Sequence, residues 1–196
     1  MRLFTGLDIP AREKQELDRL IQRFRPIAPA LRWSDAENLH VTTKFIGDWP
    51  ETRLAELSTA LANVPRCGPI EVRLSGLGWF PNPHQPRIFW VSVKVPPALP
   101  ALARATEEEL AVAFGITTEA RAYTPHLTLA RIPAGPTSPG IELALLRREV
   151  ASLASPDFGL FLATAFHLYR SDPQPGGRSL YTKLATFPTT LPEENR

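Results

Sequence analysis

Apolar residues recur at helical spacing in four stretches of the chain and alternate with polar residues in most of the others. The helical stretches are 11–24, the segment that Pro50 opens, 99–114 and 141–153. The stretches with the alternation or composition of strands are 2–8, 40–46, 70–80, 87–95, 125–132, 158–169 and 180–187. This mixture of helices and strands predicts an α+β fold.

The two halves of the chain resemble each other. The His-Val-Thr-Thr of residues 40–43 matches the His-Leu-Thr-Leu of residues 126–129, and the proline-rich loop 79–87 resembles the loop 169–178. We therefore expect two lobes related by a pseudo-twofold axis, each an antiparallel sheet with helices on its outer face. The lobes would interleave along one domain, residues 1–196, with an active-site cleft between them.

Each repeated motif places a histidine and a threonine on one face of a strand. Side chains two residues apart point the same way, so His40 projects with Thr42 and His126 with Thr128. If the lobes face each other, two imidazoles and two hydroxyls converge. One imidazole can take a proton from an attacking water while the other protonates a departing oxygen. The hydroxyls can stabilise the charge that builds on a phosphate, so the set predicts phosphodiester cleavage.

Three more residues near these motifs are candidates for substrate binding. Lys44 lies four residues after His40, on the same face of a regular strand, and could offset phosphate charge. Arg131 lies five residues after His126, so only a bulge or the strand end would return it to the histidine face. Tyr123 could stack on a nucleobase.

Composition and charge narrow the class of protein further. The chain has 196 residues, a formal net charge of +2 and one cysteine, Cys67. A disulfide-stapled secreted fold is excluded, and a long nucleic-acid footprint held by charge alone is disfavoured. The chain shows neither a signal peptide nor the roughly 20-residue apolar run that would span a bilayer. We expect a cytoplasmic, membrane-free protein that uses no metal and no organic cofactor.

The motifs and their context resemble a known family. His40 to Gly47 and Pro125 to Arg131 are similar to the two signature motifs of the two-histidine (2H) phosphoesterases, in particular the bacterial and archaeal RNA 2′,3′-cyclic phosphodiesterases first named for 2′-5′ RNA ligase activity. The resemblance implies the fold of that superfamily, with His40 as proton donor and His126 as acceptor. It also implies hydrolysis of RNA 2′,3′-cyclic phosphates to 2′-phosphomonoesters. Thr43 departs from the more usual aliphatic residue but points away from the histidine face.

Two alternatives remain open at this stage. The first is ATP-independent 2′-5′ ligation, in which a sugar hydroxyl replaces water as the nucleophile. The second is a non-catalytic module that binds RNA phosphate ends. The expected partner in each reading is RNA, with tRNA fragments among the candidates, and the expected state is a monomer.

Overall fold

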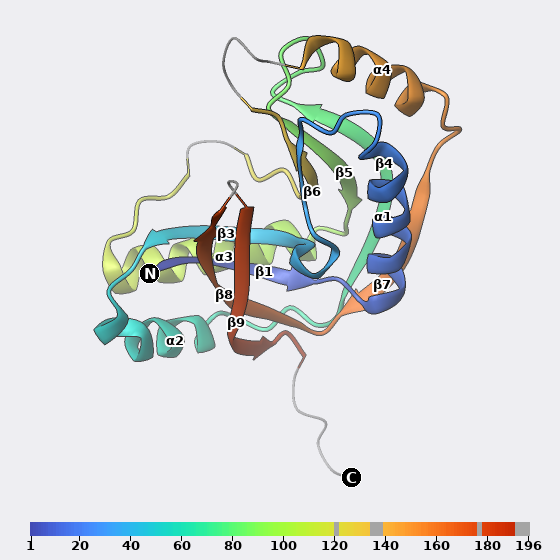
Figure 1. Ribbon diagram of the computed structural model, residues 1–196. Helices are drawn as coiled ribbons and strands as arrows, with labels where there is room; N and C mark the ends of the chain where they lie inside the picture. The colour runs from blue at the N-terminus through green and yellow to red at the C-terminus, as the bar shows by residue number, and fades with distance from the viewer. Residues whose placement is uncertain (120–121, 134–138, 176–177, 191–196) are drawn as a thin grey trace.

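The strands of the protein form two antiparallel sheets that face each other. The computed structural model describes residues 1–119, 122–133, 139–175 and 178–190. The four-stranded sheet runs in the order β3 (His40–Asp48), β1 (Arg2–Asp8), β8 (Ala165–Gln174) and β9 (Arg178–Pro188). The five-stranded sheet runs in the order β2 (Arg32–Trp33), β6 (His126–Arg131), β5 (Ile88–Lys94), β4 (Ile70–Phe80) and β7 (Asp157–Ala163). Figure 1 shows the two sheets with helices around them.

The helices cover the sheets from outside, as the sequence predicts. Helix α1 (Ala11–Phe24) contacts β7 of the five-stranded sheet, and the ring of Phe24 lies 6.1 Å from that of Phe89 in β5. Helices α2 (Leu54–Ala62) and α3 (Ala98–Phe114) pack on each other and against β9 and β3. Helix α4 (Gly140–Ala151) lies beside the five-stranded sheet (Figure 1). Two short 3-10 helices, Ala36–Asn38 and Glu51–Arg53, complete the described elements. No helix in these described ranges is long and apolar enough to cross a membrane.

Each sheet draws strands from both halves of the chain. The prediction of one strand over 158–169 is wrong in one respect. The segment forms two strands, β7 and β8, which are separated by Thr164 and belong to different sheets. Ala163 before Thr164 and Phe166 after it are both buried. The apolar pattern therefore continues past Thr164 and does not reveal that one strand ends there and another begins. Thr189 donates its backbone N–H to the Thr164 carbonyl at 2.8 Å, which fixes the crossing point. The lobes are therefore interleaved.

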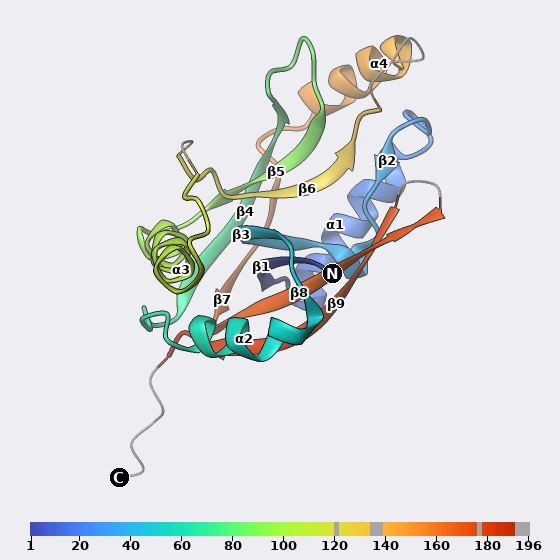
Figure 2. The ribbon, with the colours of Figure 1, turned by 90° about the vertical axis from the view of Figure 1, so that its left-hand side faces the viewer.

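The two strands that carry the repeated motifs lie opposite each other. β3 belongs to one sheet and β6 to the other, and the two strands are in contact. Figure 2 shows them side by side where the sheets meet. The fold thus brings residues 40–43 and 126–129, which are far apart in sequence, to one place.

Candidate functional site

Both motif histidines are held by equivalent hydrogen bonds to the backbone. His40 Nδ1 lies 2.7 Å from the Asn38 carbonyl oxygen, and His126 Nδ1 lies 2.9 Å from the Thr124 carbonyl oxygen. A carbonyl oxygen only accepts, so Nδ1 is the donor in each ring. In the neutral tautomer the opposite nitrogen, Nε2, is then left unprotonated. Each ring is oriented by the backbone two residues earlier and offers Nε2 for proton transfer.

His40 sits on an aromatic platform. Its ring centroid lies 4.6 Å from that of Phe4 and 5.0 Å from that of Tyr181, and its Nε2 lies 3.1 Å from the Thr42 hydroxyl. Burial lowers the pKa of His40 to about 4, while the hydrogen bond to Asn38 opposes that shift. Electrostatic interactions with Arg131 and the His126 ring lower this pKa further. His40 is therefore neutral at neutral pH while the site is empty.

His126 and Thr42 share a pocket of about 660 Å³ between the two sheets. The rings of His126 and Phe80 are nearly perpendicular, with centroids 5.0 Å apart and ring planes at 85°. We call this space the aromatic pocket; its defining residues come from both lobes and are Thr42, Phe45, Phe80, Ile88, Tyr123 and His126. The two histidine strands thus contribute to one cavity.

Tyr123 lines the aromatic pocket but is tied to the backbone. Its hydroxyl donates to the Thr42 carbonyl at 2.8 Å, across the gap between the lobes. Burial raises the pKa of Tyr123 well above its ordinary value, so the phenol stays neutral. Tyr123 therefore fixes the loop before His126 against β3, and its hydroxyl already has a partner.

A β-bulge follows each histidine motif at the same position. Thr5 of β1 pairs with Lys44 and Gly6 pairs with Thr42, which leaves Thr43 as the extra residue in β3. Phe89 of β5 pairs with Ala130 and Trp90 pairs with Thr128, which leaves Leu129 as the extra residue in β6. An extra residue reverses the alternation beyond it. The histidine face therefore continues at the fifth residue after each histidine and not at the fourth.

The bulge in β3 turns Lys44 into the protein. Its side chain is only 4% exposed, and its ammonium lies 2.5 Å from a Glu107 carboxylate oxygen and 3.3 Å from one of Glu119. The expectation that Lys44 shares a face with His40 is wrong for this reason. Phe45, the next residue, is exposed at the aromatic pocket instead. Lys44 borders the pocket, but two carboxylates balance its charge.

The bulge in β6 has the opposite consequence for Arg131. Ala130 is fully buried, whereas Arg131 is exposed and lines a pocket together with Asn38 and Tyr181 from the other lobe. Its charge is close enough to lower the pKa of His40. The structure thus places Arg131 near His40.

The chain matches one family of phosphoesterases in sequence. A family model described as LigT like Phosphoesterase matches residues 7–90. A protein of Methanocaldococcus jannaschii named RNA 2′,3′-cyclic phosphodiesterase is 30% identical over 90% of this chain and 95% of its own length. A protein of the same name from Methanothermobacter thermautotrophicus is 30% identical over 95% of this chain and 98% of its own. The chain belongs to the LigT-like phosphoesterase family.

Solved structures of similar proteins agree with this assignment. The crystal structure of the Thermus thermophilus protein TT0787 matches with a TM-score of 0.74 at 27% identity, covering 96% of this chain and 98% of that one. E. coli LigT complexed with 3′-AMP matches with a TM-score of 0.73 at 25% identity, covering 97% and 98%. The resemblance to two-histidine phosphoesterases that the motifs indicate is thereby confirmed.

Thr128 and Thr43 of this LigT-like phosphoesterase differ in their surroundings. Thr128 is partly exposed on the face of His126, and its carbonyl accepts a hydrogen bond from the Ser34 hydroxyl at 2.9 Å. Thr43 is buried, and its hydroxyl lies 2.7 Å from that of Thr5. Thr43 therefore points away from the histidine face, as expected.

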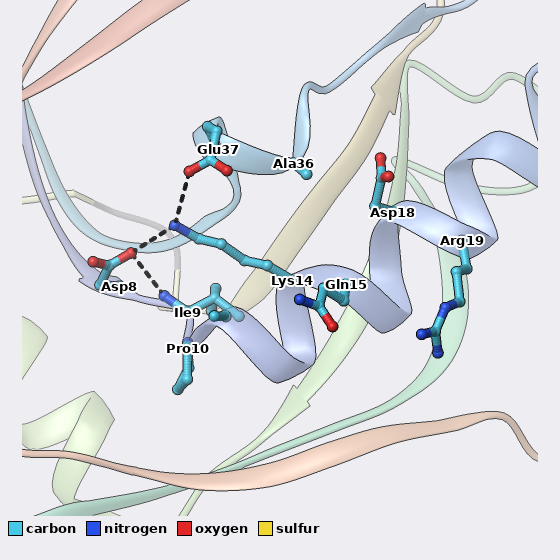
Figure 3. A pocket seen from close by; sticks show the side chains of 10 residues that line it. Asp8, Ile9, Pro10, Lys14, Gln15, Asp18, Arg19, Ala36 and Glu37 are labelled. Atoms are coloured by element: carbon cyan, nitrogen blue, oxygen red, sulfur yellow. Dashed lines mark hydrogen bonds and ion pairs between the residues drawn. The ribbon is translucent and has the colours of Figure 1, made fainter.

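A second pocket, which includes Asp8, the register partner of His40, is dominated by paired charges. Lys14 lies 3.2 Å from Asp8 and 3.9 Å from Glu37, and Lys183 lies 2.8 Å from Asp8 (Figure 3 shows the first two pairs). Burial raises the pKa of Asp8, but the hydrogen bonds from Lys183 and Lys14 outweigh that effect and lower it. This pocket of about 580 Å³ therefore offers few free charges to a substrate.

The chain has two further histidines, His84 and His167, and the sequence predicts no metal site. Over residues 1–119, 122–133, 139–175 and 178–190, no three His, Cys, Asp or Glu side chains come together as a metal site. His84 is exposed in the β4–β5 loop. His167 is buried on β8 with its Nδ1 3.0 Å from the Thr186 hydroxyl, and burial lowers its pKa to about 4.

Several residues that shape the site carry no local sequence signal. The carbonyls of Asn38 and Thr124 act through the backbone, so residue type does not identify them. Phe80 and Tyr181 reach the histidines from distant strands. Gly6 of β1 makes room for β3, because a Cβ atom there would lie 2.8 Å from the Val41 carbonyl oxygen. These contacts depend on sheet pairing.

Proposed function

We propose that this protein hydrolyses 2′,3′-cyclic phosphate ends of RNA. One observation carries the proposal: two imidazoles on facing strands, each oriented through Nδ1, with Nε2 of His40 beside the Thr42 hydroxyl. The named activity of the relatives from two archaea supports the same reaction. The complex of E. coli LigT with 3′-AMP supports a nucleotide as the ligand class.

The reaction follows from the placement of the two imidazoles. Neutral His126 takes a proton from water as the water oxygen attacks phosphorus. The bond between phosphorus and O3′ breaks, and His40 donates a proton to O3′, which leaves a 2′-phosphomonoester. The hydroxyls of Thr42 and Thr128 and the guanidinium of Arg131 stabilise the charge on the non-bridging oxygens. His40 must first gain a proton, which the negative charge of the bound substrate favours.

The aromatic pocket fits the nucleobase of the terminal nucleotide. Phe80 and Phe45 line this pocket, and aromatic side chains beside a single-stranded end stack on unpaired bases. Tyr123 supports the wall of this pocket through its bond to Thr42. The charge of Lys44 is balanced by carboxylates, so we assign its role to holding the pocket in shape.

The alternatives share the same histidines and differ in product. Ligation would require a ribose hydroxyl to displace water in the same attack, and water is present at far higher concentration. A module that only binds RNA ends has no need for a matched acid and base. We therefore favour hydrolysis. A cytoplasmic location, a monomeric state, a single domain, tRNA fragments as the source of ends, and independence of metals stay predictions.

The test uses an RNA oligomer that ends in a 2′,3′-cyclic phosphate. The purified protein should convert it to a 2′-phosphate, identified by phosphorus NMR, and prior treatment with a chelator should leave the rate unchanged. A ligated product, a 3′-phosphate as the main product, or loss of activity that a divalent ion restores would each contradict the corresponding part of the proposal. Absence of turnover with tight binding would favour the binding module.

A further inference from the structure

The histidine pair has chemically different surroundings on its two sides. One side is the aromatic pocket with Thr42 and His126. The other side is a pocket that contains Arg131, Asn38 and Tyr181, and the last two also border the space around His40. Both spaces are lined by residues of the two sheets. A ligand that binds between the histidines can therefore extend in two directions.

Arginines line the side away from the aromatic pocket. Arg32 and Arg131 are register partners in the β2–β6 pair, so their side chains share one face. Arg178, at the start of β9 in the other sheet, lines the same space. Arg178 and Arg32 also line a neighbouring pocket of about 360 Å³, to which Arg25 contributes. We call these two neighbouring pockets, with their four arginines, the arginine groove.

The arginine groove carries an excess of positive charge. Within the part of the chain that the structure describes, none of its four arginines forms an ion pair, whereas many other arginines do. Asp35 is the one carboxylate among the described residues that line it. A groove of this kind is complementary to a chain of phosphates.

The walls of the arginine groove are anchored at several points. The Trp33 indole donates to the Ala28 carbonyl at 2.8 Å, which holds β2 against the core. Asn38 joins the lobes, because its amide donates to the Ser179 carbonyl at 2.8 Å and its oxygen accepts from the Tyr181 N–H at 3.3 Å. These bonds fix the backbone on either side of the arginines. The groove is therefore preformed for a ligand.

We infer that the arginine groove binds the RNA strand on the 5′ side of the cyclic phosphate, with Arg32 and Arg178 on its phosphates. This inference rests on the proposed function. In a terminal nucleotide, the base at C1′ and the preceding strand at C5′ leave the ribose from the two ring carbons that flank O4′. Both lie on the face opposite the cyclic phosphate, and they diverge from each other. With the cyclic phosphate between the histidines and the base in the aromatic pocket, the strand extends toward Arg131 and the groove. The protein then selects oligonucleotide ends over mononucleotides.

The experiment compares two substrates that share a terminal base. One is cytidine 2′,3′-cyclic phosphate, and the other is an eight-nucleotide RNA that ends in the same group. The variants are Arg32→Gln, Arg178→Gln and the double variant. Arg104→Gln is the matched control, because Arg104 is 80% exposed on α3 and pairs only with Glu108 among the described residues.

We expect the groove variants to change the KM of the oligomer and not that of the mononucleotide. Each groove variant should raise the KM of the oligomer about fivefold, as loss of one exposed phosphate contact does. The slope of log KM against log salt should fall by about 0.7 per arginine, the value for single strands. The KM and kcat of the mononucleotide should stay unchanged, as should both substrates with Arg104→Gln.

Each other outcome has a separate meaning. Equal losses for mononucleotide and oligomer, or no loss for either, would overturn the strand path. Equal losses for Arg104→Gln and the groove variants would show general charge attraction and would also overturn it. Failure of the wild-type protein to hydrolyse either substrate would instead refute the proposed function. Thermal unfolding of every variant checks that the fold is retained.

Discussion

Binding of a tetrahedral dianion should raise the pKa of His40. In the empty site burial lowers this pKa from 6.5 to about 4, which corresponds to roughly 3 kcal/mol against the charged ring. A unit charge about 4 Å away contributes on the order of 4 kcal/mol at an effective dielectric constant of about 20. A dianion between the histidines therefore offsets the cost of burial. We expect the pKa of bound His40 to return to about 6.5 or above.

Sulfate is a suitable probe, because it stays a dianion between pH 4 and 9. Nitrogen chemical shifts of the imidazoles, recorded against pH with and without sulfate, report the pKa directly. Calorimetry at pH 6 in two buffers of different ionisation enthalpy counts the protons taken up on binding. His40 is neutral at pH 6 in the empty site and mostly charged in the complex, so uptake by His40 should reach about three-quarters of a proton or more. Uptake should vanish as the pH rises above the pKa of the complex.

His167 serves as the internal control. Burial also lowers its pKa to about 4, but it lies on β8 with Thr186 as partner and does not line the aromatic pocket. Its titration should not change with sulfate. The reasoning would be refuted if His40 titrated near 6.5 in the empty protein, or if sulfate bound without moving its pKa. If sulfate changed the pKa of His40 and of His167 by the same amount, the cause would be a general ionic effect.

Three further predictions follow from the same site. First, His40→Ala and His126→Ala should each lower turnover of a cyclic phosphate by roughly 10²- to 10⁴-fold with unchanged unfolding curves, and near-normal turnover in either variant would rule out a shared acid and base. Second, Lys44→Met should lower the free energy of unfolding by about 2 kcal/mol, since it leaves Glu107 without its buried partner. The KM of that variant for cytidine 2′,3′-cyclic phosphate should be unchanged, and a large rise would return Lys44 to a role in binding phosphate. Third, stability should fall as the pH drops from about 6.5 to 4, because His40 and His167 accept protons more readily in the unfolded chain than in the folded one. Urea denaturation of His167→Phe at several pH values should show a shallower fall, and an unchanged fall would contradict this account.

The sequence was sufficient wherever the signal is local and periodic. The helix over 11–24 and the strand over 2–8 have the predicted bounds, because amphipathic spacing reflects which side is buried. The placement of His40 with Thr42, and of His126 with Thr128, follows from the alternation of a strand and agrees with the burial pattern. The repeat of the motif indicated two facing lobes, since a lone histidine would have given no reason to expect a partner.

The sequence was insufficient wherever a contact depends on strands that pair over long distances. Nothing at Thr164 marks the point where the chain passes from one sheet to the other, because the residues on both sides are apolar and buried. The carbonyls that orient the histidines are backbone groups present at every position. The arginines of the groove are separated by about 150 residues in sequence, from Arg25 to Arg178, and only the packing of β2 and β9 joins them.

The two bulges show how such pairing decides which residues belong to the site. Strand periodicity alone assigns the fourth residue after each histidine to the catalytic face, which selects Lys44 and excludes Arg131. Extra residues at Thr43 and Leu129 reverse both assignments. The register with the neighbouring strand creates each bulge, and the neighbours lie roughly 40 residues away, so no local window reveals it. Because the same offset occurs in both lobes, the cleft gains one aromatic residue, Phe45, from one strand and one cation, Arg131, from the other. This asymmetry on a repeated framework gives a nucleotide different surroundings for its base and its phosphates.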